Sequence, residues 1–154
     1  MSENMASIVG WRGFVFRNGK LRSLVIPGFE YNVRSRYDNY GSYIFGFSQS
    51  VQLHNHVGIW LVKPHTLQRV IKSYVTNVIG ICVATPNTLV VEHEQGYRCE
   101  DVVIRELWIN RNNKIPNLKE ALEEEYRCDV HIGYPSGSKV RAITHGYRES
   151  EAYN

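Results

Sequence analysis

Five acidic or basic side chains fall within nine consecutive residues of this chain, and three of them are the best candidates for a catalytic group. These three are His93, Arg98 and Glu100. An imidazole can carry a proton near physiological pH, a guanidinium grips phosphate or carboxylate through paired hydrogen bonds, and a carboxylate can orient either of them. The structural alternative is a buried pair of Arg98 and Glu100, with His93 packed beside it, that only fixes a hairpin in place.

The residues around these candidates predict a β-hairpin that positions them. The stretches 88–94 and 97–105 contain many β-formers, and Gln95-Gly96 between them predicts a two-residue turn. In that register His93 lies opposite Arg98, and Glu92 lies opposite Cys99. Side-chain alternation then divides the hairpin into one face with Leu89, Val91, His93, Arg98 and Glu100 and another with Val90, Glu92, Glu94, Tyr97 and Cys99.

A second hairpin is predicted near the N-terminus, where Asn18-Gly19 separates strands over 8–17 and 20–26. Both turn residues tolerate a positive φ, which a type I′ turn requires. Phe16 then opposes Leu21, and Phe14 and Phe16 share the face that we expect to be buried.

The remaining patterns predict short elements of both kinds. A strand over 51–62 is followed by Pro64 and a short helix, and the apolar run 75–84 fits a strand or a helix. The stripe of that first helix consists of Leu67, Val70, Ile71, Tyr74 and Val78. Further strands are expected over 99–109 and 128–132, a helix capped by Asn117 over 118–126, and a turn over 135–138. The fold class is therefore α+β, a mostly antiparallel β-sheet with one or two short helices.

Length and composition predict one folded domain over residues 1–154, with 1–6 and 149–154 disordered. The net charge of +3 is too small to require a nucleic acid or an anionic membrane as partner. The three cysteines are widely spaced without a CxxC pair, which favours a reducing cytoplasm over a disulfide framework. Neither a signal peptide nor an apolar stretch of membrane-spanning length is present, so we expect a soluble cytoplasmic protein without a cofactor.

His54 and His56 are the best candidates for a metal site, although no metal is predicted. On a strand they project from one face about 7 Å apart, so a third ligand such as His65, His93 or Glu92 would be needed. The alternative is a pair of exposed or hydrogen-bonded histidines. Glu92 and Glu94 could likewise bind a divalent cation or be solvated. His131 and His145 have no recognisable partner in the sequence.

Seven aromatic residues between positions 29 and 47 are interleaved with arginines, and this segment is the best candidate for a binding surface. Arg34 and Arg36 could hold phosphates while aromatic rings stack on bases, or half of the rings could belong to the core. The stretch 37–41 is expected to be a loop rich in Tyr, Asn and Gly, as protein-binding surfaces are. The candidate ligand- or partner-binding residues are Arg34, Arg36, Tyr37, Tyr40 and Tyr43.

The chain resembles a family of small uncharacterised proteins of bacteria and some of their phages. The resemblance covers roughly residues 10–130 and depends mainly on the motif Val-Val-Glu-His-Glu-x-Gly-Tyr-Arg-x-Glu at 90–100, with Leu-Glu-Glu-Glu-Tyr at 122–126. Weaker matches are Gly-Lys-Leu-Arg-Ser at 19–23, Pro-Gly at 27–28, Val-Ile-Gly at 78–80 and a histidine-bearing stretch ending at Trp60. Val57 stands where the family usually has a cysteine. The resemblance implies a shared β-rich fold and carries no activity.

Three functions follow as expectations. The first is a binding protein, phage-encoded if the resemblance holds, that sequesters a small anionic ligand or blocks a host protein in an anti-defence or regulatory role. The second is a small hydrolase or transferase that uses His93, Arg98 and Glu100, with or without a metal. The third, a nucleic-acid binder, is disfavoured by the small net charge. The first is favoured because no phosphate-binding loop, nucleophile elbow or firm metal motif is present.

Overall fold

The computed structural model describes residues 8–22, 35–38, 41–45, 58–73, 76–84 and 88–151. Within these ranges the chain forms ten strands and three helices. In chain order they are β1 (Val9–Arg17), β2 (Lys20–Arg22), β3 (Ser35–Asp38), β4 (Gly41–Phe45), β5 (Ile59–Val62), α1 (Pro64–Ser73), β6 (Val78–Ala84), β7 (Val90–Glu92), β8 (Gly96–Cys99), β9 (Asp101–Ile109), α2 (Leu118–Tyr126), β10 (Asp129–Ile132) and α3 (Gly137–Glu151).

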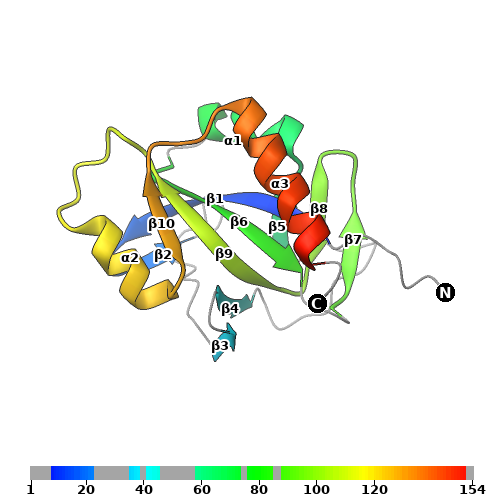
Figure 1. The fold of residues 1–154 in the computed structure, drawn as a ribbon, viewed down its shortest axis with the longest axis horizontal. Helices are drawn as coiled ribbons and strands as arrows, with labels where there is room; N and C mark the ends of the chain where they lie inside the picture. Colours follow the sequence, from blue (N-terminus) through cyan, green and yellow to red (C-terminus); the bar gives the residue numbers. More distant parts are fainter. Residues whose placement is uncertain are drawn as a thin grey trace.

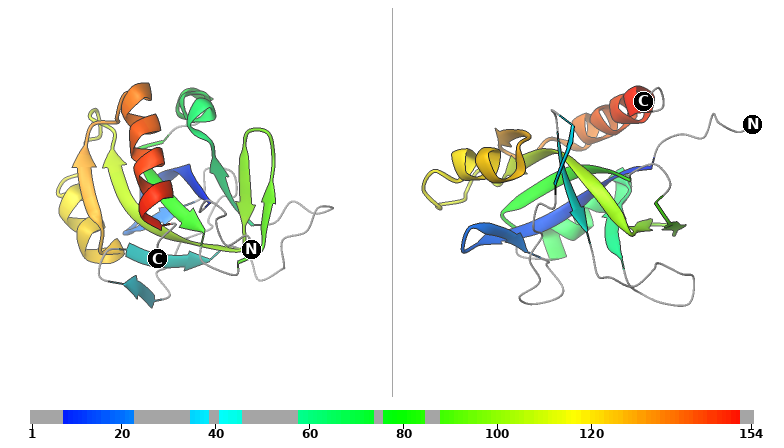
Figure 2. Two further views of the ribbon diagram at one scale, coloured as in Figure 1. Left: turned by 45° about the vertical axis from the view of Figure 1, so that its right-hand side comes forward. Right: turned by 90° about the horizontal axis from the view of Figure 1, so that it is seen from below.

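The strands form one sheet in the order β3-β4-β9-β6-β1-β5-β8-β7, and every pair along this path is antiparallel (Figure 1). Two short strands lie off the path: β2 pairs with β1, and β10 pairs with β9 in parallel. The predicted α+β class with a mostly antiparallel sheet is therefore confirmed. The β7–β8 hairpin, which carries the catalytic candidates, stands at one end of the sheet (Figures 1 and 2).

The N-terminal hairpin has the predicted turn and register. Phe16 pairs with Leu21, and the turn residues Asn18 and Gly19 have φ values of 52° and 81°. Phe14 and Phe16 are both buried, as their shared face predicted. Residues 23–26 of the predicted second strand lie outside the described residues.

The two faces of the central strands carry different apolar clusters. Helices α1 and α3 cover one face, and α2 packs against the cluster on the other. The first cluster contains Val9, Trp11, Leu67, Ile79, Ile81, Val83, Trp108 and Val140. Because β6 lies between β1 and β9 with both faces covered, its sequence is a continuous apolar run, as buried strands are. The ambiguous run 75–84 is therefore a strand over its described part from Val78 to Ala84, and Val78 belongs to β6 rather than to the helical stripe.

Helix α2 has the predicted bounds, but the prediction of Asn117 as its cap is wrong. The Asn117 backbone is left-handed, with φ 57° and ψ 28°, and its side chain makes no capping hydrogen bond. A capping side chain needs an extended backbone to reach the amides of the first turn. The helix is held instead by the burial of Leu118, Leu122 and Tyr126.

Helix α3 begins at Gly137, inside the predicted turn at 135–138, and continues through Glu151, into the end that was predicted to be disordered from 149. Residues 1–6 and 152–154 lie outside the described residues. The buried side of α3 is only partly apolar, because Thr144 stands next to Val140 in it. The Trp11 indole N–H donates to Thr144 Oγ1 at 2.8 Å, which in turn donates to the Val140 carbonyl at 2.7 Å. A hydroxyl satisfied in this way is buried at little cost, and sequence periodicity does not reveal it.

The predicted long strand over 99–109 is divided at Glu100. β8 pairs with β5 and β7, whereas β9 pairs with β4, β6 and β10. The chain therefore changes neighbours within one residue while its β-forming composition continues. Composition predicts a strand here but does not identify the partner strands.

Candidate functional site

The turn of the β7–β8 hairpin lies one residue earlier than predicted. His93 and Gly96 exchange backbone hydrogen bonds of 2.7 and 3.3 Å, so Glu94 and Gln95 occupy the loop and the predicted Gln95-Gly96 turn is wrong. Gly96 is needed for space rather than for the turn, because a Cβ there would lie 2.1 Å from the Leu61 carbonyl oxygen in β5. The pairing shifts by two residues relative to the prediction, which leaves the division of side chains between the two faces unchanged.

On one of those faces His93 and Arg98 are in contact, and Trp60 joins them. Arg98 Nε donates to His93 Nε2 at 3.0 Å. The His93 ring stacks on Trp60 with centroids 4.8 Å apart and planes at 27°, and the Arg98 guanidinium carbon lies 5.5 Å from the Trp60 ring centroid. Trp60 is brought here because it pairs with Arg98 between β5 and β8. The sequence predicted the contact of His93 with Arg98 but not the indole.

Burial decides what this cluster can do. Only 1% of Arg98 is exposed, which puts its guanidinium out of reach of a ligand in solution. Because a guanidinium can only donate, His93 Nε2 must accept, and the proton of the neutral ring is then on Nδ1. The arrangement fastens the hairpin to β5.

Glu100 lies on the same face of the hairpin by alternation. Its backbone N–H donates to the Leu89 carbonyl at 3.1 Å, and its side chain is half-buried. Its contact with Arg98 and a catalytic role of the three residues stay predictions.

The opposite face of the hairpin carries a second set of polar contacts. Lys63 Nζ lies 2.8 Å from Glu92 Oε2 and 5.2 Å from the centroid of the Tyr97 ring. Arg148 of α3 donates to the Tyr97 hydroxyl at 3.3 Å. The hydrogen bond between Lys63 and Glu92 raises the pKa of the lysine and lowers the pKa of the carboxyl. Lys63, Glu92, Tyr97 and Arg148 therefore form one connected group.

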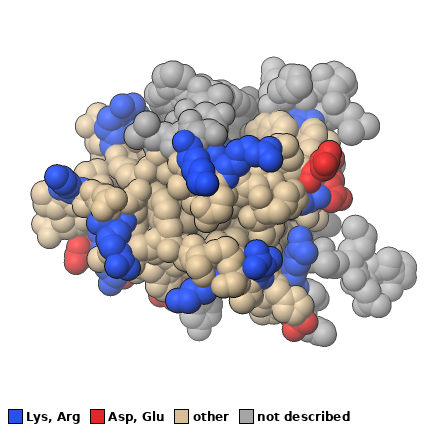
Figure 3. Space-filling model, turned by 90° about the horizontal axis from the view of Figure 1, so that it is seen from above, with Lys and Arg blue, Asp and Glu red and all other residues tan. Residues whose placement is uncertain are grey.

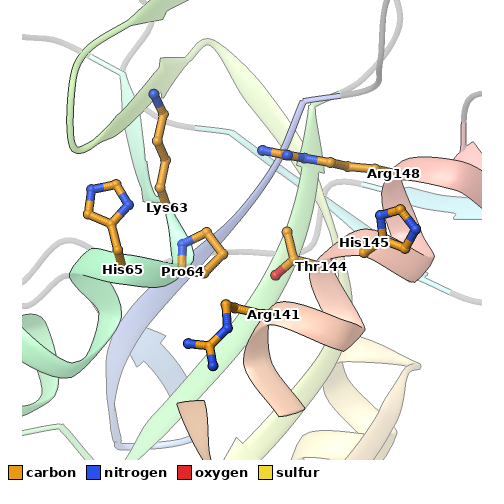
Figure 4. A pocket seen from close by; sticks show the side chains of 7 residues that line it. All are labelled: Lys63, Pro64, His65, Arg141, Thr144, His145 and Arg148. Carbon is orange, nitrogen blue, oxygen red and sulfur yellow. The ribbon is translucent and has the colours of Figure 1, made fainter. Parts of the chain in front are cut away.

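This group borders a pocket of about 370 Å³ between the start of α1 and one side of α3 (Figure 4). Five of the seven lining residues are basic and none is acidic; the lining consists of Lys63, Pro64, His65, Arg141, Thr144, His145 and Arg148. Lys63 and His65 come from the end of β5 and the start of α1, and Arg141 and Arg148 extend from α3 on the other side of the cavity (Figure 4).

The basic side chains differ in whether they are already paired. Lys63 is bound to Glu92, and His145 Nε2 lies 3.1 Å from Glu149 Oε1. Within the described part of the chain, the side chains of His65 and Arg141 make no hydrogen bond or ion pair. The first turn of α1 also contains no acidic residue, so the positive end of its dipole adds to the local potential.

The surrounding surface has the same sign of charge. Seen from above, the end of the molecule formed by α1 and the start of α3 carries scattered Lys and Arg side chains, while Asp and Glu appear at its margins (Figure 3). The walls of the pocket are held by packing, since Leu67 of α1 and Val140 of α3 belong to one buried cluster.

Sequence reasoning did not find this pocket. Its residues come from two distant segments, and no element was predicted for the second of them, which lies between the predicted turn at 135–138 and the predicted disordered end from 149. Arg141, His145 and Arg148 stand at i, i+4 and i+7, the spacing of one helix side, and this was the available signal. The statement that His145 and His131 have no recognisable partner is also corrected by the structure.

His131 belongs to a separate network that connects β9, β10 and α3. Its Nε2 lies 2.7 Å from Glu106 Oε1, and its ring stacks on Trp108 with centroids 5.0 Å apart. The Tyr147 hydroxyl donates to the other oxygen of Glu106. Burial raises the pKa of Tyr147, with a further contribution from that hydrogen bond. The Tyr147 hydroxyl therefore stays protonated and donates its hydrogen bond to the Glu106 carboxylate.

The three cysteines are free and unsuited to nucleophilic chemistry. Burial raises the pKa of Cys99 and of Cys128 to about 12 and that of Cys82 even further. A thiol with such a pKa is protonated at neutral pH, whereas the thiolate is the reactive form.

Several predicted site residues lie outside the described residues: Arg34, Tyr40, His54 and His56. Arg36 and Tyr37 fall in β3 and Tyr43 in β4, so Tyr37 is in a strand rather than the predicted loop. The two strands pair antiparallel, with a register shift between Arg36 and Asp38. In the described ranges no three His, Cys, Asp or Glu side chains gather closely enough to hold a metal ion.

Comparison with known proteins adds no relative to this picture. In the described part of the chain no helix has the length and apolar character needed to cross a membrane. No protein-family model, curated protein or solved structure matches the chain.

Proposed function

We propose that this protein binds a small anionic ligand in the basic pocket between α1 and α3. The observation that supports this most directly is the lining itself, with five basic side chains and no acidic one around a cavity of about 370 Å³. Lys63, Arg141 and Arg148 place three positive charges around the cavity, and an anion would interact favourably with them.

The size of the pocket favours a small molecule over a macromolecule. Its volume is at the lower end of the roughly 300–1,000 Å³ usual for small-molecule sites. Arg141 is the residue best placed to contact the ligand, since it lines the cavity and is unpaired within the described ranges. A guanidinium offers paired N–H donors that match the oxygens of a phosphate or carboxylate.

The proposal predicts that Arg141→Gln weakens anion binding by about tenfold, because a hydrogen bond to a charged group contributes roughly 1.5 kcal/mol or more. Calorimetric titration with inorganic phosphate, pyrophosphate and citrate at low salt measures the dissociation constants.

Lys139→Gln is the matched control. It removes the same charge from the same helix, at an exposed position outside the pocket lining. We expect Lys139→Gln to change the dissociation constants by less than about twofold, a long-range effect that salt screens. Equal losses in the two variants, or no binding by the unaltered protein, would overturn the proposed function.

A further inference from the structure

The basic residues of the pocket fall into two groups. Lys63 and Arg148 both contact Tyr97, one over its ring and one at its hydroxyl. The hydrogen bond to Glu92 raises the pKa of Lys63, and the charge of Arg148 opposes that rise. His65 and Arg141 take no part in these contacts. In Figure 4 the tips of Lys63 and Arg148 lie on one side of Pro64, and the Arg141 guanidinium lies on the other.

The first group is already occupied by a carboxylate of the protein. Glu92 does not line the pocket, yet its Oε2 lies 2.8 Å from Lys63 Nζ. The Glu92 side chain is 64% exposed, so it can swing into solvent without losing buried contacts. An anion that uses Lys63 must therefore displace Glu92, whereas an anion that uses Arg141 meets no competitor in the described structure.

The hairpin keeps this competing carboxylate close to Lys63. Glu92 pairs with Tyr97 between β7 and β8, and the Lys63 amide donates to the Gln95 carbonyl at 2.9 Å. On the other face, Trp60, His93 and Arg98 fasten the same hairpin to β5. A tethered group competes at a high effective concentration, which a free monovalent anion in dilute solution does not reach.

On these grounds we infer that the pocket has two anion subsites, an open one at Arg141 and one at Lys63 and Arg148 that Glu92 occupies. The inference rests on the proposed function and deepens it. The ligand class is a molecule with two linked anionic groups, a diphosphate or bisphosphate. One group binds at the open subsite, and the second, then held close by the first, displaces Glu92 from Lys63.

The test compares Glu92→Gln with Glu94→Gln in titrations with inorganic phosphate, pyrophosphate and tripolyphosphate. Glu94 is exposed in the loop of the same hairpin, so it reports the general effect of removing one negative charge. We expect Glu92→Gln to tighten pyrophosphate or tripolyphosphate roughly two- to fivefold, the range of an exposed ion pair, and inorganic phosphate by less than about 1.5-fold. Glu94→Gln should change all three by less than about 1.5-fold.

A double-mutant cycle identifies the residue through which Glu92 acts. In a Lys63→Gln background the gain from Glu92→Gln should disappear, because no ammonium remains to be released. Equal gains for phosphate and the longer anions, no gain for any of them, or a gain that persists without Lys63 would overturn the two-subsite inference. If these results accompany anion binding that Arg141→Gln still weakens, the proposed function stands; if no anion binds at all, both are overturned.

Discussion

Gly96→Ala should lower the free energy of unfolding by roughly 3 kcal/mol, the upper range for overpacking a tightly packed site. A Cβ at this position would lie 2.1 Å from the Leu61 carbonyl oxygen and 3.0 Å from the Val62 Cα. Both obstacles are backbone, so relief requires β5 and β8 to separate. Urea unfolding followed by fluorescence measures the loss.

Gly19 is the contrasting case, because a glycine is needed there for its backbone conformation rather than for space. Its φ is +81° and nothing lies within 4 Å of an added Cβ, so its cost is conformational. Gly19→Ala should cost about 1 kcal/mol, and Gly19→Asn less, since Asn tolerates the left-handed region. Gly96→Asn should be as damaging as Gly96→Ala. If asparagine rescues position 96 as it does position 19, the close approach to β5 is not the reason for this glycine.

These two glycines show what local sequence patterns can predict and what they cannot. Asn18-Gly19 predicted a turn, a register and a buried face correctly, because both residues of the pair adopt the positive φ that the turn needs. Gln95-Gly96 looks similar in the sequence, but its glycine is required by a neighbouring strand. A single sequence does not distinguish a glycine needed for φ from one needed for space.

The same limit applies to the helices. Helix α2 was predicted with correct bounds, although Asn117, which was expected to cap it, makes no capping hydrogen bond. Helix α3 was missed because one of its buried positions is Thr144, whose hydroxyl is satisfied only through Trp11 and the Val140 carbonyl. Long-range hydrogen bonds of this kind make a polar residue acceptable inside, and no periodicity predicts them.

The candidate site also has a part that the sequence predicts and a part that it does not. The contact of His93 with Arg98 was predictable because both residues belong to one hairpin. The pocket was not, since it joins the start of α1 to the exposed side of α3. Lys63 links the two regions: its backbone hydrogen-bonds to the hairpin loop, and its side chain lines the pocket.

Arg98→Ala should also lower the free energy of unfolding by a large amount, roughly 3 to 5 kcal/mol. This is the range for removing one partner of a buried polar pair. The side chain is among the largest that are fully buried. Its removal leaves a cavity beside Trp60 and leaves His93 Nε2 without its donor. Arg69→Ala, at an exposed position of α1, should stay within about 0.5 kcal/mol of the unaltered protein in the same unfolding measurement.

Arg98→Lys separates geometry from charge. Lysine keeps the positive charge but lacks the planar fork that reaches His93 and Trp60 together, so we expect it to recover only part of the stability lost in Arg98→Ala. His93→Ala should cost about 1 kcal/mol, because the imidazole is half-buried and contributes one hydrogen bond and one stack. An Arg98→Ala protein as stable as the parent but unable to bind or turn over a ligand would contradict the structural role. In that case His93, Arg98 and Glu100 would form a functional site.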